Sequence, residues 1–267
     1  MVHRVYLVFI GLFAACSASP KKEPVGAGLL QAPAAPAPSY DTTAQTLHVF
    51  VALCDNKYQG IVPVPAAIGN GQDPNSNLYW GCSSGIRTYF KKSAHWELLL
   101  RRKGTSPVLE RLLFRHNNTG AYLVADAFDG RYIKDCTIAF LNACAGRIAD
   151  TIVHEGRVLG TGGAARLMAY IGHDGLMDFS LPATIQAADQ KQRDAIILAC
   201  ISKKYFAPHL RAAGARPLLW TTGLMCPEAY TLHDALEVYL AKGSAQRVRE
   251  AAARPTIASR NAGRRRP

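Results

Sequence analysis

Two reactive side chains stand directly after short apolar runs of the chain. The run 167–171 is followed by Gly-His-Asp-Gly, which places His173 in a glycine-rich turn, and the run 195–199 is followed by Cys200. A cysteine becomes nucleophilic near neutral pH when a base or a lowered pKa favours its thiolate, and a nearby histidine supplies both. The pair therefore indicates thiol chemistry, with His173 as the general base and Cys200 as the nucleophile.

The two runs have the length and composition of strands that are buried on both faces. A connection of about 20 residues joins them, which suits a crossover between neighbouring parallel strands. In parallel α/β sheets, active sites form where the carboxyl ends of the strands meet the loops. We therefore expect the imidazole of His173 and the thiol of Cys200 at the same edge of one sheet.

The rest of the chain alternates between strand-like and helix-like segments. Strands are predicted at 47–54, 96–100, 108–114, 121–128, 167–171, 195–199 and 217–221. Helices are predicted from Ser84 to about 94, from 132 to 145 before Gly146, and from Thr231 to 243, with Ser84 and Thr231 as N-caps. Strands separated by helices predict an α/β fold, a three-layer sandwich with a mainly parallel central sheet and helices on both faces.

Residues 1–16 have the features of an export signal. Arg4 precedes the apolar run 5–15, and these 11 residues are too few for a span of about 20. Two alanines before Cys16 resemble the lipobox of bacterial lipoproteins, which implies lipidation of Cys16. The residue after it is not Asp, which by resemblance to lipoprotein sorting favours the periplasmic face of the outer membrane. Cleavage near Ala18, giving a secreted protein, is the alternative.

Segments of biased composition flank the predicted domain. The stretch 17–46 is rich in Pro, Ala and Ser and buries too little apolar area to offset chain entropy, so we predict a tether. The stretch 247–267 contains seven arginines and one acid, and we predict a basic disordered tail. The domain between them, 47–246, holds 21 basic and 16 acidic residues, so the formal charge of +12 does not indicate a nucleic-acid partner.

The motifs around the two reactive residues resemble those of the caspase-like cysteine peptidases, which include caspases, metacaspases, legumain, gingipains and clostripain. Members have an apolar strand ending in His-Gly and a later one ending in Ala-Cys-x-Ser. Residues 199–202, Ala-Cys-Ile-Ser, fit the second motif, and residues 172–175 fit the first except that Asp174 replaces glycine. The resemblance implies a caspase-like fold over 47–243 and a catalytic dyad of His173 and Cys200.

The resemblance also implies an oxyanion hole, made by the backbone N–H after the histidine and that of the cysteine. Asp174 keeps its N–H but brings a carboxylate that opposes a developing oxyanion. Gly175 belongs to the same turn, where glycine allows close approach of a substrate backbone. Asn56, after the first strand, is comparable to the asparagine that orients the histidine in legumain-like members.

Other thiols and histidines allow other interpretations. A cysteine after a buried strand is often an inert core thiol, and Cys54 ends a strand too, so it is an alternative nucleophile. Without Cys16 and Cys200 an odd number of cysteines remains, and their pairing cannot be derived: Cys54, Cys82, Cys136, Cys144 and Cys226. No C-x-x-C occurs, and five histidines lack ligand spacing, so we expect no metal and no cofactor: His48, His95, His116, His209 and His233. The run 160–163 resembles a phosphate loop but precedes a strand, so we predict a turn.

Three functional hypotheses follow. The first is an exported cysteine endopeptidase that hydrolyses peptide or protein substrates. Its lipid anchor would hold it on a membrane. The second is an inactive caspase-like module that binds or scaffolds on the cell envelope, which Asp174 favours. The third is an unrelated periplasmic α/β binding domain. The oligomeric state is left open.

Overall fold

Residues 39–263 are described by the computed structural model; the predicted signal segment with Cys16 and most of the predicted tether lie outside them. The strands are β1 (Thr46–Ala52), β2 (Trp96–Lys103), β3 (Val108–His116), β4 (Tyr122–Phe128), β5 (Ala149–His154), β6 (Arg157–Gly162), β7 (Leu167–Ile171), β8 (Asp194–Leu198) and β9 (Arg216–Leu219). The helices are α1 (Ile86–Lys92), α2 (Ile133–Cys144), α3 (Ser202–Ala212), α4 (Ala229–Leu240) and α5 (Ala245–Gly263), with short 3-10 turns at Gly130–Tyr132 and Gly175–Met177.

The central sheet has seven strands in the order β2-β3-β4-β1-β7-β8-β9. Strands β4, β1, β7, β8 and β9 are parallel, and the antiparallel hairpin β2–β3 extends the sheet at one end. All seven residues of β1 are buried, as are those of β4, because helices cover both faces of the sheet and the β5–β6 hairpin packs on part of β4. The apolar runs predicted as strands are therefore confirmed as neighbours in one mainly parallel sheet.

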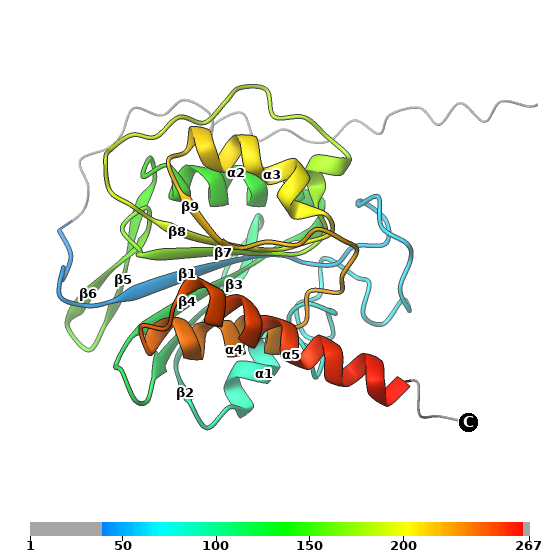
Figure 1. Cartoon of the computed structure of the whole chain (residues 1–267), viewed down its shortest axis with the longest axis horizontal. Coiled ribbons are helices and arrows are strands. Elements are labelled where there is room, and N and C mark those ends of the chain that lie inside the picture. Colours follow the sequence, from blue (N-terminus) through cyan, green and yellow to red (C-terminus); the bar gives the residue numbers. More distant parts are fainter. Residues whose placement is uncertain (1–38, 264–267) are drawn as a thin grey trace, which may run out of the picture.

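Helices lie in two layers around the sheet (Figure 1). Helices α2 and α3 cover one face, and α1, α4 and α5 cover the other. Each layer has its own apolar core, the first built around Phe140, Tyr170 and Phe206 and the second around Trp80 and Phe90. The α/β fold with helices on both faces is confirmed. No helix among residues 39–263 has both the length and the apolar character of a membrane span.

Two predicted helix caps are wrong. Helix α1 starts after Gly85 and α4 after Glu228, and neither has a side-chain cap. The carbonyl of Ser84 instead accepts the N–H of Ala229 at 2.8 Å. The carbonyls of Tyr79 and Trp80 accept the first N–H groups of α1, so backbone carbonyls take the place of side-chain caps. Thr231 lies inside the first turn of α4. The predicted stop at Gly146 is confirmed by its positive φ of 73°.

A short hairpin was not predicted. Strands β5 and β6 pair antiparallel, apart from the central sheet, and Glu155 and Gly156 form the turn with φ of 49° and 75°. The run 160–163, predicted as a turn, is strand up to Gly162, and only its end turns. The alternation of polar and apolar residues in β5 is too short to distinguish a strand from a loop in the sequence alone.

The prediction of a disordered tail from residue 247 is wrong for most of its length, because α5 extends to Gly263. Val248, Ala251 and Ala252 are buried at helical spacing, and Val248 and Ala252 pack in the core that includes α4. The arginines of this segment leave that apolar stripe intact, and alanine favours the helix. The prediction of disorder relied on the number of charged residues and did not consider this apolar stripe.

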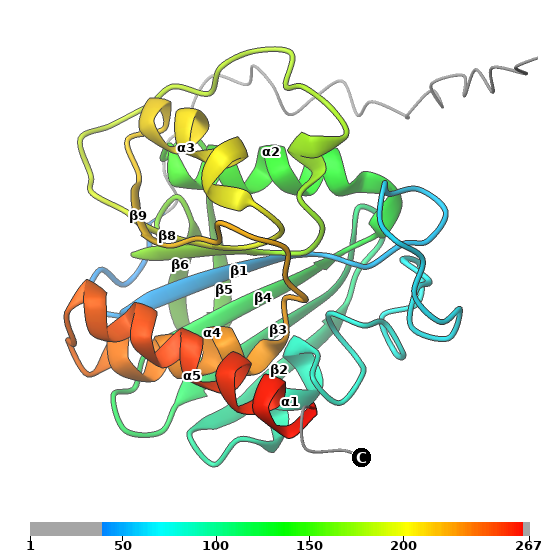
Figure 2. The ribbon, with the colours of Figure 1, turned by 45° about the vertical axis from the view of Figure 1, so that its right-hand side comes forward.

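The two edges of the sheet differ from its centre. At one end β2 turns Arg101, Arg102 and Lys103 to solvent. At the other end β9 is four residues long and includes Pro217. The long segment 53–85 has no strand or α-helix and lies beyond the carboxyl end of β1 (Figure 2).

The packing of α5 leads to a first prediction. Val248→Asp places a charge in the core and should lower the free energy of unfolding by about 2–4 kcal/mol. Gln246→Asp introduces the same residue at an exposed position of the same turn and should change it by less than about 0.5 kcal/mol. Denaturant unfolding measures both variants. Equal stability of the two variants would mean that α5 does not pack as described.

Candidate active site

Strands β7 and β8 bring the two predicted catalytic residues to one edge of the sheet. The strands pair in parallel with Ile171 opposite Leu198. His173 and Cys200 each follow two residues after this pair, so both leave the sheet at its carboxyl edge. The predicted adjacency of the two strands is confirmed.

His173 is held by an acid that the sequence did not suggest. Its ring is buried, and Nε2 lies 2.7 Å from an oxygen of Asp178. That oxygen also accepts the N–H of Gly60 at 2.9 Å, where a Cβ would collide with the carboxylate. The carbonyl of His173 accepts the hydroxyl of Tyr170 at 2.8 Å. Nδ1 makes no hydrogen bond to any residue in 39–263, so it is the nitrogen available to a reacting group.

Asn56 does not take the orienting role that the family resemblance implies. Its amide nitrogen donates to the carbonyl of Val64 at 2.7 Å, and its oxygen accepts the N–H of Val64 at 3.0 Å. The side chain of Asn56 therefore closes a loop. Asp178, and not Asn56, orients the imidazole of His173. Asp178 follows a 3-10 turn five residues after His173, and no spacing rule singles it out in the sequence.

Cys200 sits in a strained connection between β8 and α3. The next residue, Ile201, has φ of 50°, a conformation rare for a β-branched residue that costs about 1–3 kcal/mol. Sγ of Cys200 lies 3.4 Å from both the N and the O of Met225 and is partly exposed. Within the described chain no hydrogen bond joins Cys200 to His173. Such contacts are often long before substrate binds.

The backbone at this edge has free donors. The N–H groups of Asp174 and Cys200 make no hydrogen bond to another described residue. They are the two donors that the resemblance assigns to an oxyanion hole. Gly175 is needed for packing, because a Cβ there would come within 2.6 Å of the Phe179 ring.

Asp174 points into the protein. One oxygen accepts the N–H of Leu176 at 3.1 Å, and the other is buried with no partner among the described residues. Burial, with a smaller contribution from Asp178, raises the pKa of Asp174 to about 7. The carboxyl group is thus largely neutral below that pH, which weakens the objection that it repels an oxyanion.

The alternative nucleophile Cys54 is poorly suited to reaction. It is fully buried, and burial raises the pKa of its thiol to about 11. Cys136 and Cys144 are also buried, and burial raises the pKa of both thiols. All six cysteines in the described range are free thiols.

A groove of about 430 Å³ is lined in part by Met225, whose backbone contacts Cys200, whereas neither Cys200 nor His173 lines it. It is mostly apolar, with Arg249 of α5 at its rim. Its walls come from the ends of β8 and β9, from the loop 221–225 and from α4 and α5. No family model, curated protein or solved structure matches this chain.

The buried carboxyl group of Asp174 gives a pH-dependent prediction. Free Asp titrates near 3.9, so as pH rises from about 4 to about 7 the unfolded chain ionises more readily than the folded one, and stability falls. This one group should lower the free energy of unfolding by about 2–3 kcal/mol between about pH 5 and about pH 8. Asp174→Asn should lack that component in denaturant unfolding, whereas Glu97→Gln, on the exposed face of β2, should retain it. The same pH dependence in Asp174→Asn and the wild type would contradict the assignment.

Thiol reactivity gives a third prediction. Iodoacetamide at about pH 6–7 should label Cys200 first, and faster than an ordinary free thiol, if the imidazole of His173 acts on it as a base. His173→Ala should slow this labelling, and His209→Ala on α3 should not. Mass mapping locates the label. Preferential labelling of Cys54 would reject the assignment.

Proposed function

We propose that this chain is a cysteine endopeptidase of caspase-like type, acting through His173 and Cys200. The observation that supports it most is the register of β7 and β8, which carries both residues to one edge. Asp178 orients the imidazole. The strained residue Ile201 directly follows the thiol in the connection between β8 and α3. Backbone strain of this kind gathers at functional sites.

The proposed reaction gives each of these groups a role. Nδ1 of His173 takes the proton of Cys200, and the thiolate attacks the carbonyl carbon of a peptide bond. The N–H groups of Asp174 and Cys200 donate to the oxyanion of the tetrahedral intermediate. The imidazolium then protonates the leaving amine, and water hydrolyses the acyl-enzyme to release the acid and the thiol.

An inactive binding module is the second candidate. It is favoured by Asp174 in the place of the family's glycine and by the lack of a direct hydrogen bond between His173 and Cys200. The groove lined in part by Met225 would then bind a peptide without cleaving it. On either hypothesis we propose an exported protein held at the membrane by Cys16.

A fluorogenic peptide library with basic, acidic, Asn and apolar residues before the scissile bond tests the enzyme. Cleavage by the wild type should fall at least about 10³-fold in Cys200→Ala, because the nucleophile is lost. Cys82→Ala, a partly exposed thiol elsewhere, should keep full activity. Asp178→Asn should lower kcat more than it raises KM, because Asp178 positions the base.

Two outcomes would overturn the proposal. Cleavage that persists in Cys200→Ala rejects the mechanism. A silent wild type that gains activity in Asp174→Gly identifies the chain as an inactive relative.

A further inference from the structure

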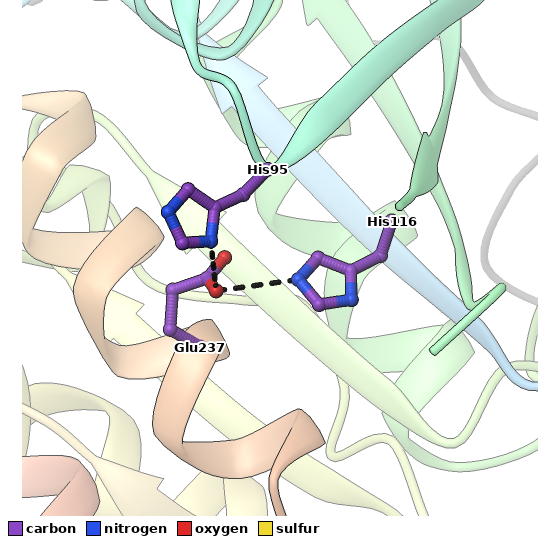
Figure 3. A group of neighbouring side chains, drawn as sticks. All are labelled: His95, His116 and Glu237. Atoms are coloured by element: carbon purple, nitrogen blue, oxygen red, sulfur yellow. Dashed lines mark hydrogen bonds and ion pairs between the residues drawn. The ribbon is translucent and has the colours of Figure 1, made fainter. Parts of the chain in front are cut away.

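We propose that His95, His116 and Glu237 form a binding site for a zinc-type divalent metal ion (Figure 3). His95 precedes β2, His116 ends β3, and Glu237 lies on α4. Strand β3 runs antiparallel to β4, so its carboxyl end lies at the amino edge of the parallel strands. The site is therefore at the opposite edge of the sheet from Cys200.

The donor atoms already lie near metal-binding distances. Nδ1 of His95 is 2.7 Å and Nε2 of His116 is 3.2 Å from the same oxygen of Glu237. All three donor atoms are within 4.8 Å of one another. Ligand atoms of a tetrahedral zinc site with bonds of 2.0–2.1 Å are about 3.3 Å apart. Small side-chain shifts would therefore make room for an ion among the two imidazole nitrogens and the carboxylate oxygen that now lies within hydrogen-bonding distance of both.

Neighbouring groups orient the three side chains. The indole N–H of Trp96 donates to the other oxygen of Glu237 at 3.1 Å. The ring of His116 is buried, and its Nδ1 lies 2.8 Å from the Thr119 hydroxyl. With a metal on Nε2, Nδ1 carries the proton and donates it to that hydroxyl, and the Thr119 N–H loses its present contact of 3.2 Å with Nδ1. Partners of this kind hold the rings of metal-binding histidines.

The donor set selects the class of ion. Two imidazole nitrogens and one carboxylate suit zinc and its first-row neighbours, whereas magnesium and calcium prefer oxygen ligands alone. Three protein ligands leave a fourth position for water. Half of the His95 side chain is exposed, which gives the ion access from solvent.

A bound ion would join α4 to the β2–β3 hairpin. The hairpin is the antiparallel extension of the sheet, and its outer strand pairs with β3 alone. The sequence predicted no metal here because the ligands are separated by 20 and 120 intervening residues, and only the fold brings them together. His233 lies beside the site, but its Nε2 is 2.8 Å from the Ser93 hydroxyl and is engaged there.

Zinc binding to the purified chain tests the site. The protein is stripped with a chelator and its accessible thiols are alkylated, so that surface cysteines cannot hold the metal. Equilibrium dialysis with Zn²⁺ should give one ion per chain, and Zn²⁺ should raise Tm because it binds the folded state. His95→Ala and Glu237→Gln should each weaken binding by more than the roughly 10- to 100-fold that loss of an outer partner costs. His209→Ala on α3 is the matched control and should bind as the wild type does.

Because His95 is exposed, we expect its variant to keep the fold, and circular dichroism checks this for both variants. A wild type that binds no zinc after alkylation rejects the site. Equal zinc binding by the wild type, His95→Ala and Glu237→Gln rejects it too. Either result would leave the cluster as a hydrogen-bonded contact between α4 and the hairpin.

Discussion

The parallel pairing of β1, β7 and β8 at the centre of the sheet is the constraint on which the other features depend. These strands are buried on both faces, so every backbone group must find its partner along the ladder. A shift of one residue would exchange the side chains that face the two helix layers. The register is therefore fixed by packing on both sides, and it determines which residues emerge together at the carboxyl edge.

Polar side chains hold the long segment 53–85 over that edge without regular structure. Asn77 is buried, donates to the carbonyl of Cys54 at 2.8 Å and accepts its N–H at 3.1 Å. The buried Glu110 of β3 accepts from Trp80 of this segment and from Arg101. Burial alone would raise the pKa of Glu110, but these hydrogen bonds and the charge of Arg87 keep that pKa below its usual value.

The sequence predicted what local patterns encode. Short apolar runs identified the strands of the parallel sheet, and the order of strands and helices placed His173 and Cys200 at one edge. Contacts between distant segments were not predictable: Asp178 becomes a partner of His173 through the turn after β7, and Glu237 meets two histidines through the packing of α4. The prediction of a disordered tail failed because it relied on the many arginines of this segment. Only three buried positions make α5 a packed helix.

The two outer strands of the sheet bear on how copies of the molecule meet. An unpaired strand edge can extend into a neighbouring chain, and this route leads to fibres. Charged side chains on β2 and the shortness and proline of β9 oppose such pairing at both ends. Self-association by strand addition at either edge of the central sheet is therefore disfavoured.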